Sequence, residues 1–154
     1  MILDSWLNLD SHVRAACTSC RYHTWALQHI CRLISEESAQ TLACSIIMSR
    51  LDYSNSLFYG MPVYVHNKLQ SVQNTLARVV TRSDAWTSAA PLLVKLHWLL
   101  IHQRISYKLA MLTFRVRTTS TPQYLSSLIS VPRSTGYSLR STDHPLLTCQ
   151  EQEH

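Results

Sequence analysis

The sequence predicts a mainly α-helical protein: a bundle of about five to six helices with a short extended N-terminus and an irregular C-terminal tail. First, apolar residues recur at spacings of three and four along most of the chain, which is the period of a half-buried helix. Second, only 2 of the 154 residues are glycine, whereas many-stranded barrels and phosphate-binding loops depend on glycine-rich turns. Third, 46% of the residues are apolar and 15% are charged, which supports a buried core.

The first helix is expected to begin at Asp10 or Ser11, either of which can cap it. Ser35 supplies a fresh N-cap for a second helix, with Glu36 and Glu37 in its first turn, where carboxylates favour the helix dipole. We expect the second helix to end near residues 60–62. The residues predicted to face the core are Val13, Cys17, Cys20, Thr24, Leu27, Cys31 and Ile34 in the first helix, and Ala39, Leu42, Ala43, Ile46, Ile47 and Leu51 in the second.

A third helix is expected from about Val63 or Tyr64 to Arg82, and its polar side carries cations. Spacings of three and four place Lys68, Arg78 and Arg82 on one stripe of one face. Ser71 and Thr75 share that stripe, and the core face is predicted to hold Val65, Leu69, Val72, Leu76 and Val79.

After a loop over residues 83–90, Pro91 is well placed in the first turn of a short helix that ends near Leu96. A fifth helix is expected from about Leu100 to Arg117, with Leu100 allowing little break before it. Its predicted core face is Ile101, Ile105, Leu109, Leu112 and Val116, and an adjacent stripe carries Arg104, Lys108, Met111 and Arg115.

The last short helix is predicted over residues 123–129, with Thr121 as its cap and Pro122 as its first residue. From residue 130 onward the apolar period is lost among serine, threonine, proline and glycine, so we expect an irregular tail over residues 130–154.

The basic residues are concentrated in the middle of the chain. The formal charge is 14 − 9 = +5, but ten cations and only one acidic residue, Asp84, lie between Tyr53 and Thr142. Such an excess attracts polyanions by releasing counterions from phosphate backbones. The alternative interpretation is a solvated face that keeps the domain soluble. The candidate phosphate-binding residues are Lys68, Arg78, Arg82, Arg104, Lys108 and Arg115.

The sequence offers no recognisable catalytic or metal site. Polymerase and nuclease chemistry needs clustered carboxylates, but only Glu36 and Glu37 are adjacent, and a helix start explains them. Cys17 and Cys20, with His23 nearby, lack a second ligand pair, so we interpret these cysteines as buried core residues. Among the tryptophans, Trp98 is predicted to be a core residue and the loop residue Trp86 is kept as a base-stacking candidate.

No apolar run approaches the roughly 20 residues that span a bilayer, and the first residues show no signal-peptide pattern. The five cysteines are an odd number with uneven spacing, unlike a secreted disulfide framework. We therefore expect an intracellular protein, cytoplasmic or nuclear, without a membrane partner.

Six blocks of the sequence, in order and with consistent spacing, resemble one family over nearly the whole chain. They are ILDSWLNLDSHV (residues 2–13), SRLDYSNSLFYGMP (49–62), KLQSVQNTLARVVT (68–81), PLLVKLHWLLIHQRISYKLAMLTFR (91–115), PQYLSSLI (122–129) and SLRSTD (138–143). They are similar to the region downstream of the palm in reverse transcriptases of non-LTR retrotransposons, the LINE elements of the jockey and chicken-repeat type. Departures include Ser54, where the family commonly has cysteine, and Leu100, where it has proline.

The resemblance implies a remnant of the palm at residues 1–10, a helical thumb-like domain at 11–129 and the tail at 130–154. It also implies that the catalytic aspartates lie upstream of the matched blocks, since Leu51-Asp52-Tyr53 is not their motif. No catalytic residue is therefore assigned. No cofactor is expected for this chain, because Mg²⁺ belongs to the complete parent polymerase.

The first hypothesis is accordingly a truncated fragment of an RNA-directed DNA polymerase that holds RNA or a template–primer duplex and is inactive alone. The alternatives are an independent helical module that binds a protein partner through exposed apolar surface, and a relic without function.

Overall fold

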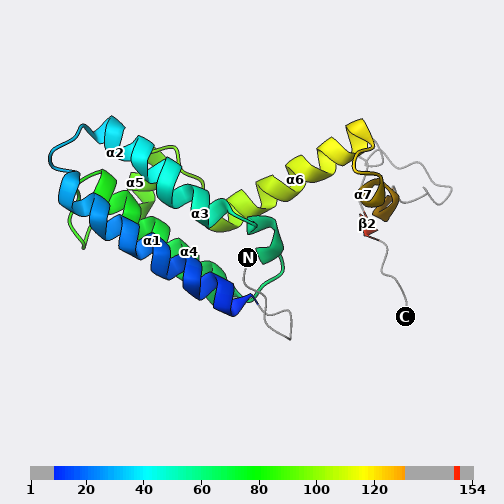
Figure 1. The fold of residues 1–154 in the computed structure, drawn as a ribbon, viewed down its shortest axis with the longest axis horizontal. Coiled ribbons are helices and arrows are strands. Elements are labelled where there is room, and N and C mark those ends of the chain that lie inside the picture. The colour runs from blue at the N-terminus through cyan, green and yellow to red at the C-terminus, as the bar shows by residue number, and fades with distance from the viewer. Residues whose placement is uncertain (1–8, 131–147, 150–154) are drawn as a thin grey trace. The chain divides into compact units, whose positions relative to one another are not determined.

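The structure, a computed structural model, describes residues 9–130 and 148–149 and is mainly helical, as the sequence predicts (Figure 1). The chain forms two compact units, Met1–Lys108 and Leu109–His154, so the predicted domain over residues 11–129 crosses their boundary. The elements of the first unit are α1 (Asp10–Ile30), α2 (Glu36–Leu42), the π-helix η1 (Ala43–Met48), α3 (Ser49–Asp52), the 3-10 helix η2 (Asn55–Phe58), α4 (Val63–Val80), α5 (Ala89–Lys95) and the start of α6 (Ile101–Thr119). The second unit contains the rest of α6, then α7 (Gln123–Leu128), β1 (Ile129–Ser130) and β2 (Thr148–Cys149).

The centre of the first unit is the pair α1 and α4, which lie side by side (Figure 1). At their N-terminal ends the Tyr64 hydroxyl donates to both carboxylate oxygens of Asp10, at 2.9 and 2.8 Å. At their C-terminal ends Arg32 and Arg82 line one pocket, so the two helices run parallel. Most of the residues predicted to face the core in these two helices are buried. They include Val13, Cys17, Cys20, Leu27, Cys31, Val65, Leu69, Val72 and Leu76.

The beginning of α1 differs from the prediction. The N-cap residue is Leu9, which offers no side-chain cap, and Asp10 lies inside the first turn. Its carboxylate is held by Tyr64 instead of by the helix's own amides, although it still lies at the positive end of the helix dipole. The cap predicted for α2 is confirmed, because Ser35 Oγ accepts from the Ser38 amide at 3.1 Å.

The predicted second helix is interrupted by a π-helical turn over Ala43–Met48. Ala39 is fully buried, and an unbroken α-helix would bring Arg50, eleven residues later, back to the same buried side. The extra residue in the π-turn shifts the register, so that Met48 and Leu51 are buried while Arg50 is exposed. The same shift explains why Ile46, predicted to face the core, is 38% exposed.

The α-helical conformation ends at Asp52 and not near Gly60 as predicted. Ser54 adopts a left-handed conformation, with φ of 59°, and η2 follows it. Gly60, with φ of 74°, then turns the chain toward α4.

The end of α5 is a sharp stop rather than the smooth continuation predicted from Leu100. His97 is left-handed, with φ of 55°, and its amide donates to the Val94 carbonyl at 3.0 Å. The next amide, of Trp98, reaches back to the Leu93 carbonyl at 2.9 Å. These two bonds form a Schellman motif, and the buried side chains of Leu93 and Trp98 occupy its apolar positions. Trp98 is thus a core residue, as predicted.

His97 occupies the position at which helices usually end in glycine, so His97→Gly is expected to stabilise the protein by about 0.5–1 kcal/mol. The left-handed conformation costs a residue with a Cβ more than it costs glycine. Chemical denaturation followed by circular dichroism measures the change. His102→Gly is the matched control, because it removes the same exposed side chain from a right-handed position in α6 and is expected to lower stability. Equal effects of the two variants would contradict the interpretation.

The cysteines predicted to lie in the core, Cys17, Cys20 and Cys31, are buried, and Cys44 is exposed. Burial raises the pKa of the Cys20 thiol to about 11, and its S–H donates to the Ile47 carbonyl at 3.8 Å. Burial also raises the pKa of Cys17. The thiolate is the reactive form, so the environment protects both residues from thiol reagents.

We therefore expect a single fast-reacting thiol, Cys44, when the folded Cys149→Ser variant is titrated with a chromogenic disulfide at pH 8. All four remaining thiols should react after denaturation. Adding Cys44→Ser should abolish the fast phase, and a fast phase that survives would show that the buried cysteines are accessible.

The second unit begins within α6, where Val116 is buried but Leu112, predicted to face a core, is 38% exposed. Pro122 is the N-cap of α7 rather than its first residue, and Thr121 does not cap it. β1 pairs antiparallel with β2, with Ile129 opposite Cys149. The rest of the predicted irregular tail, and residues 1–8 of the predicted palm remnant, lie outside the described residues.

Candidate nucleic-acid interface

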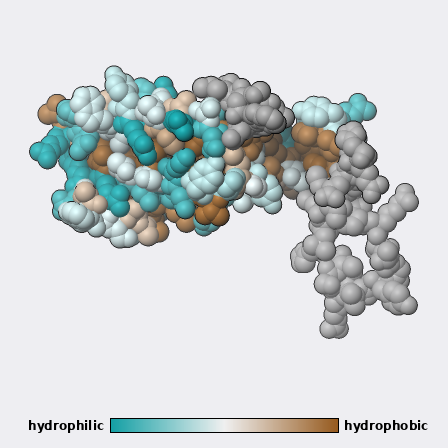
Figure 2. All heavy atoms as spheres, turned by 90° about the horizontal axis from the view of Figure 1, so that it is seen from below, coloured by the Kyte–Doolittle hydropathy of each residue, from teal (hydrophilic) through white to brown (hydrophobic). Residues whose placement is uncertain are grey.

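Cations lie on α1 and α4, and on the turns that follow these two helices, near the line along which the helices pack. We call this surface the basic seam and define it by Arg21, Arg32, Lys68, Arg78 and Arg82. All five belong to the first unit. Figure 2 shows that hydrophilic side chains cover much of this helical body on the face drawn.

The C-terminal end of the basic seam is a pocket of about 430 Å³. Arg32, Arg78 and Arg82 line it together with Thr75 and Asp84. Arg78 donates through Nε to the Thr87 carbonyl at 2.9 Å, and Arg82 donates to the Ile34 carbonyl. The three arginines carry three positive charges. Asp84 and the C-terminal ends of α1 and α4, each with about half a negative charge, offset about two of them, so a positive excess of about one charge remains.

Away from the pocket, the basic seam continues with Arg21 from α1 and with Lys68 from the N-terminal half of α4. Burial raises the pKa of the Cys17 thiol between the helices, and the charges of Arg21 and Lys68 act in the opposite direction. Both cations are therefore within electrostatic reach of the same buried atom. The Lys68 Nζ also lies 4.8 Å from the centre of the Tyr64 ring, a cation–π contact that leaves the ammonium on the surface.

Three of the five acidic residues that the structure describes in the first unit are engaged away from this surface. Glu36 pairs with Lys95 and Asp52 with Arg104. Asp10 accepts from Tyr64 at the N-terminal end of the helix pair. Among the described acidic residues, only Asp84 lines the C-terminal pocket of the basic seam, so neutralisation by carboxylates is local to that pocket.

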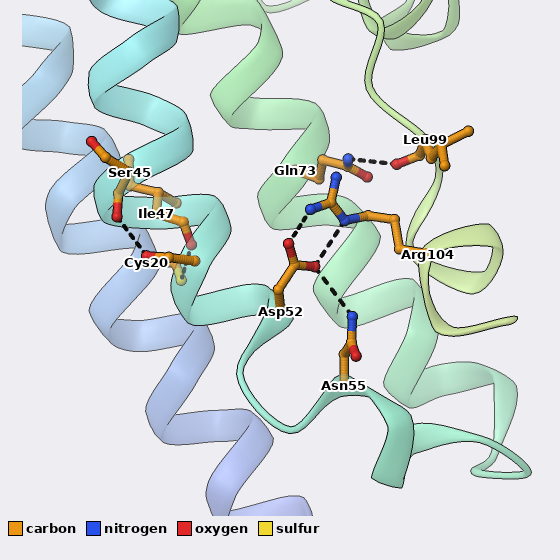
Figure 3. A network of polar contacts seen from close by, with 9 residues as sticks. Cys20, Ser45, Ile47, Asp52, Asn55, Gln73, Leu99 and Arg104 are labelled. Carbon is orange, nitrogen blue, oxygen red and sulfur yellow. Dashed lines mark hydrogen bonds and ion pairs between the residues drawn. The ribbon is translucent and has the colours of Figure 1, made fainter. Parts of the chain in front are cut away.

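Arg104 holds a structural position rather than an open one (Figure 3). Its guanidinium forms a two-pronged pair with Asp52, whose Oδ1 accepts from Arg104 Nε at 2.8 Å. Asn55 Nδ2 donates to the same oxygen at 3.2 Å. The Arg104 side chain is only 22% exposed. The pair joins α6 to the end of α3, which leaves Arg104 little capacity to bind a phosphate.

The structure thus brings together three of the six candidate residues. Lys68 and Arg78 lie on one side of α4, as their spacing predicts. The prediction for Arg82 is wrong, because α4 ends at Val80 and Arg82 follows it with a left-handed backbone, φ of 54°. Arg82 lines the same pocket as Arg78 from this turn. Lys108 is exposed and borders a separate pocket of about 270 Å³ with Arg104. Arg115 is exposed and belongs to the second unit.

Arg21 and Arg32 were not among the residues proposed from the sequence. Their stripe on α1 is visible in the helical period, but a stripe of cations on one helix does not reveal which helix lies beside it. Only the packing of α1 on α4 brings Arg32 to the pocket that Arg78 lines, and Arg21 within electrostatic reach of the same thiol as Lys68. Trp86, the base-stacking candidate, is 97% exposed in the loop after α4.

The described residues contain no group of three or more metal-ligating side chains. Within the same residues, no helix combines the length and the apolar character needed to cross a membrane. No family model, curated protein or solved structure matches the chain.

Proposed function

We propose that this chain is a thumb-like helical segment of a non-LTR retrotransposon reverse transcriptase. In this proposal it holds RNA or a template–primer duplex by contacts to phosphates and does not catalyse polymerisation by itself. The observation that carries the proposal is the basic seam, in which two parallel helices present cations to the same surface while most acidic residues are engaged elsewhere.

The dimensions of the basic seam suit a polyanion better than a small anion. Lys68 and Arg78 are separated by ten residues of α4, or about 15 Å along its axis at 1.5 Å per residue, and Arg82 lies beyond the end of the helix. One strand of a nucleic acid duplex places a phosphate about every 3.4 Å along its axis, so several phosphates fit within this length. Because such contacts involve charge and not base edges, binding is expected to show little sequence preference.

The test is to measure the affinity of the protein for labelled RNA and for a template–primer duplex at several salt concentrations. Five phosphate contacts predict a slope of log K against log salt of about −4. A complete lack of binding at low salt would contradict the proposal. Primer extension in the presence of Mg²⁺ tests the other half: no product is expected, and a product that depends on this protein would overturn the statement that it is non-catalytic.

A protein partner is the second candidate, and an apolar groove of about 240 Å³ between α1 and η1 favours it. Ile30 and Ile46, which line this groove, are 43% and 38% exposed. Exposed apolar surface of this kind is typical of protein-binding sites. Loss of partner binding on replacing Ile30 and Ile46 with serine, with nucleic acid binding unchanged, would separate this function from the first.

A further inference from the structure

An exposed tryptophan lies among the cations of the basic seam. Trp25 is 59% exposed on α1, although tryptophan is usually largely buried. It follows Arg21 by four residues, so the two side chains share one stripe of α1, and Arg32 lies in the turn just beyond the end of this helix. A large aromatic side chain is therefore presented beside the groups proposed to bind phosphates.

The orientation of the Trp25 side chain is supported by its neighbour one turn later. The ring centre of His29 lies 4.3 Å from that of Trp25, with the ring planes at 63°. His29 Nδ1 is also 2.8 Å from the Trp25 carbonyl oxygen, which ties the imidazole to the helix backbone. Because the His29 ring is anchored, the indole is restrained while more than half of the residue's surface stays open to solvent.

Tyr22, one turn before Trp25, is a second exposed aromatic residue on this part of α1, at 64% exposure. Its ring makes an edge contact with His23 at 5.3 Å. Cationic and aromatic side chains that alternate on one surface are typical of proteins that bind single strands, since cations follow the phosphates and aromatic rings stack on bases.

Resting on the proposed function, we infer that Trp25 stacks on an unpaired base of a strand whose phosphates lie along the basic seam. The bases of a duplex are stacked on one another, so a side chain approaching from the phosphate side reaches no base face. A single strand exposes both faces of every base. The seam therefore holds single-stranded nucleic acid, such as an unpaired template segment, more tightly than a blunt duplex of equal length.

Tyr59 serves as the control. It is 68% exposed and follows η2, and it is not among the residues that define the basic seam. Tyr59→Leu removes an exposed aromatic ring at a position outside the seam. A difference between the two variants therefore reports the location of the ring and not the loss of an aromatic side chain.

The experiment measures fluorescence anisotropy of three labelled probes of equal length at low salt: oligouridine, an abasic strand and a blunt duplex. Trp25→Leu is expected to weaken oligouridine binding by about tenfold, within the range of one stacked base. Trp25→Phe should retain most of the affinity, because it keeps an aromatic face. Tyr59→Leu should behave as the unmodified protein, and Trp25→Leu should leave the affinities for the abasic strand and the duplex unchanged.

Equal weakening of all three probes by Trp25→Leu would overturn the stacking inference, because a general loss of structure or charge contact explains it. Equal effects of Trp25→Leu and Tyr59→Leu, or no effect of either, would also overturn it, while salt-dependent binding of the unmodified protein would leave the proposed function standing. Failure of the unmodified protein to bind every probe would instead contradict the proposed function itself. Circular dichroism of each variant checks that its helices are retained.

Discussion

Replacing Arg21, Arg32 and Lys68 together with glutamine is expected to weaken nucleic acid binding at least about tenfold and to reduce the salt slope by about 2 to 3. Each lost phosphate contact removes about 0.7–0.9 from the slope, because fewer counterions are released. These three side chains make no hydrogen bond or ion pair in the part of the chain that the structure describes; Lys68 makes only its cation–π contact. The variant should therefore fold normally, and its affinity at a series of salt concentrations is the measurement.

The control variant replaces Arg50, Lys95 and Arg117 with glutamine, which lowers the formal charge of the whole chain by the same amount, from +5 to +2. None of these three residues belongs to the basic seam. If binding depends on the placement of charge, the control should keep most of its slope. If both variants lose affinity equally, net charge alone explains binding and the basic seam has no special role.

Replacing the buried Gln73 with leucine is expected to lower the free energy of unfolding by about 2 kcal/mol, although leucine is apolar and of similar size. Gln73 is fully buried, and its Nε2 donates to the Leu99 carbonyl at 2.8 Å (Figure 3). Its Oε1 accepts from Gln70 Nε2 at 3.0 Å. Leucine removes both hydrogen bonds, and each such bond contributes about 0.5–1.5 kcal/mol. Urea denaturation followed by circular dichroism measures the loss.

Gln28→Leu is the matched control, because Gln28 is exposed on α1 and the same change there should alter stability by less than about 0.5 kcal/mol. A Gln73→Leu variant as stable as this control would show that the amide bond to Leu99 contributes little. Gln70 extends the same network, since its Oε1 accepts from the Ile101 amide at 2.9 Å and so satisfies one of the free amides at the start of α6.

The apolar period predicted the buried faces of α1 and α4 almost residue by residue. Cys17, Cys20 and Leu69 are buried because each lies where the 3.6-residue repeat returns to the same side. The basic stripe of α4 follows from the same repeat. These features are local consequences of helix geometry, so a single sequence is sufficient to predict them.

The helix interruptions could not be predicted in the same way. The π-turn over Ala43–Met48 shifts the helical register, so that the apolar residues before and after it can both pack against neighbouring helices, including α1. This need arises from the packing and not from the local sequence. His97 takes a left-handed conformation without being glycine, because the burial of Trp98 and Leu93 fixes that turn. In both cases tertiary packing overrides the local preference of the sequence.

The sequence predicted the cations that α4 contributes to the candidate site, but not the residues that α1 contributes. The spacing within one helix predicts that Lys68 and Arg78 share a face, whereas Arg21, Arg32 and Trp25 belong to the same surface only because α1 packs beside α4. Arg82 was predicted on the same helical stripe, but α4 ends before it. Arg104 shows the reverse error: its stripe suggested an open cation, but Asp52, about fifty residues earlier, engages it. Spacing reports which side chains share a face, and it does not report what that face meets.

The parallel arrangement of α1 and α4 also has a consequence for folding. Two adjacent parallel helices need a long crossover, and here the chain from Cys31 to Pro62 lies between them. The entropy of closing that loop must be overcome before either half of the basic seam meets the other. The complete surface is therefore a high-contact-order feature that forms with the cooperative fold, and a peptide of either helix alone carries only part of its charge.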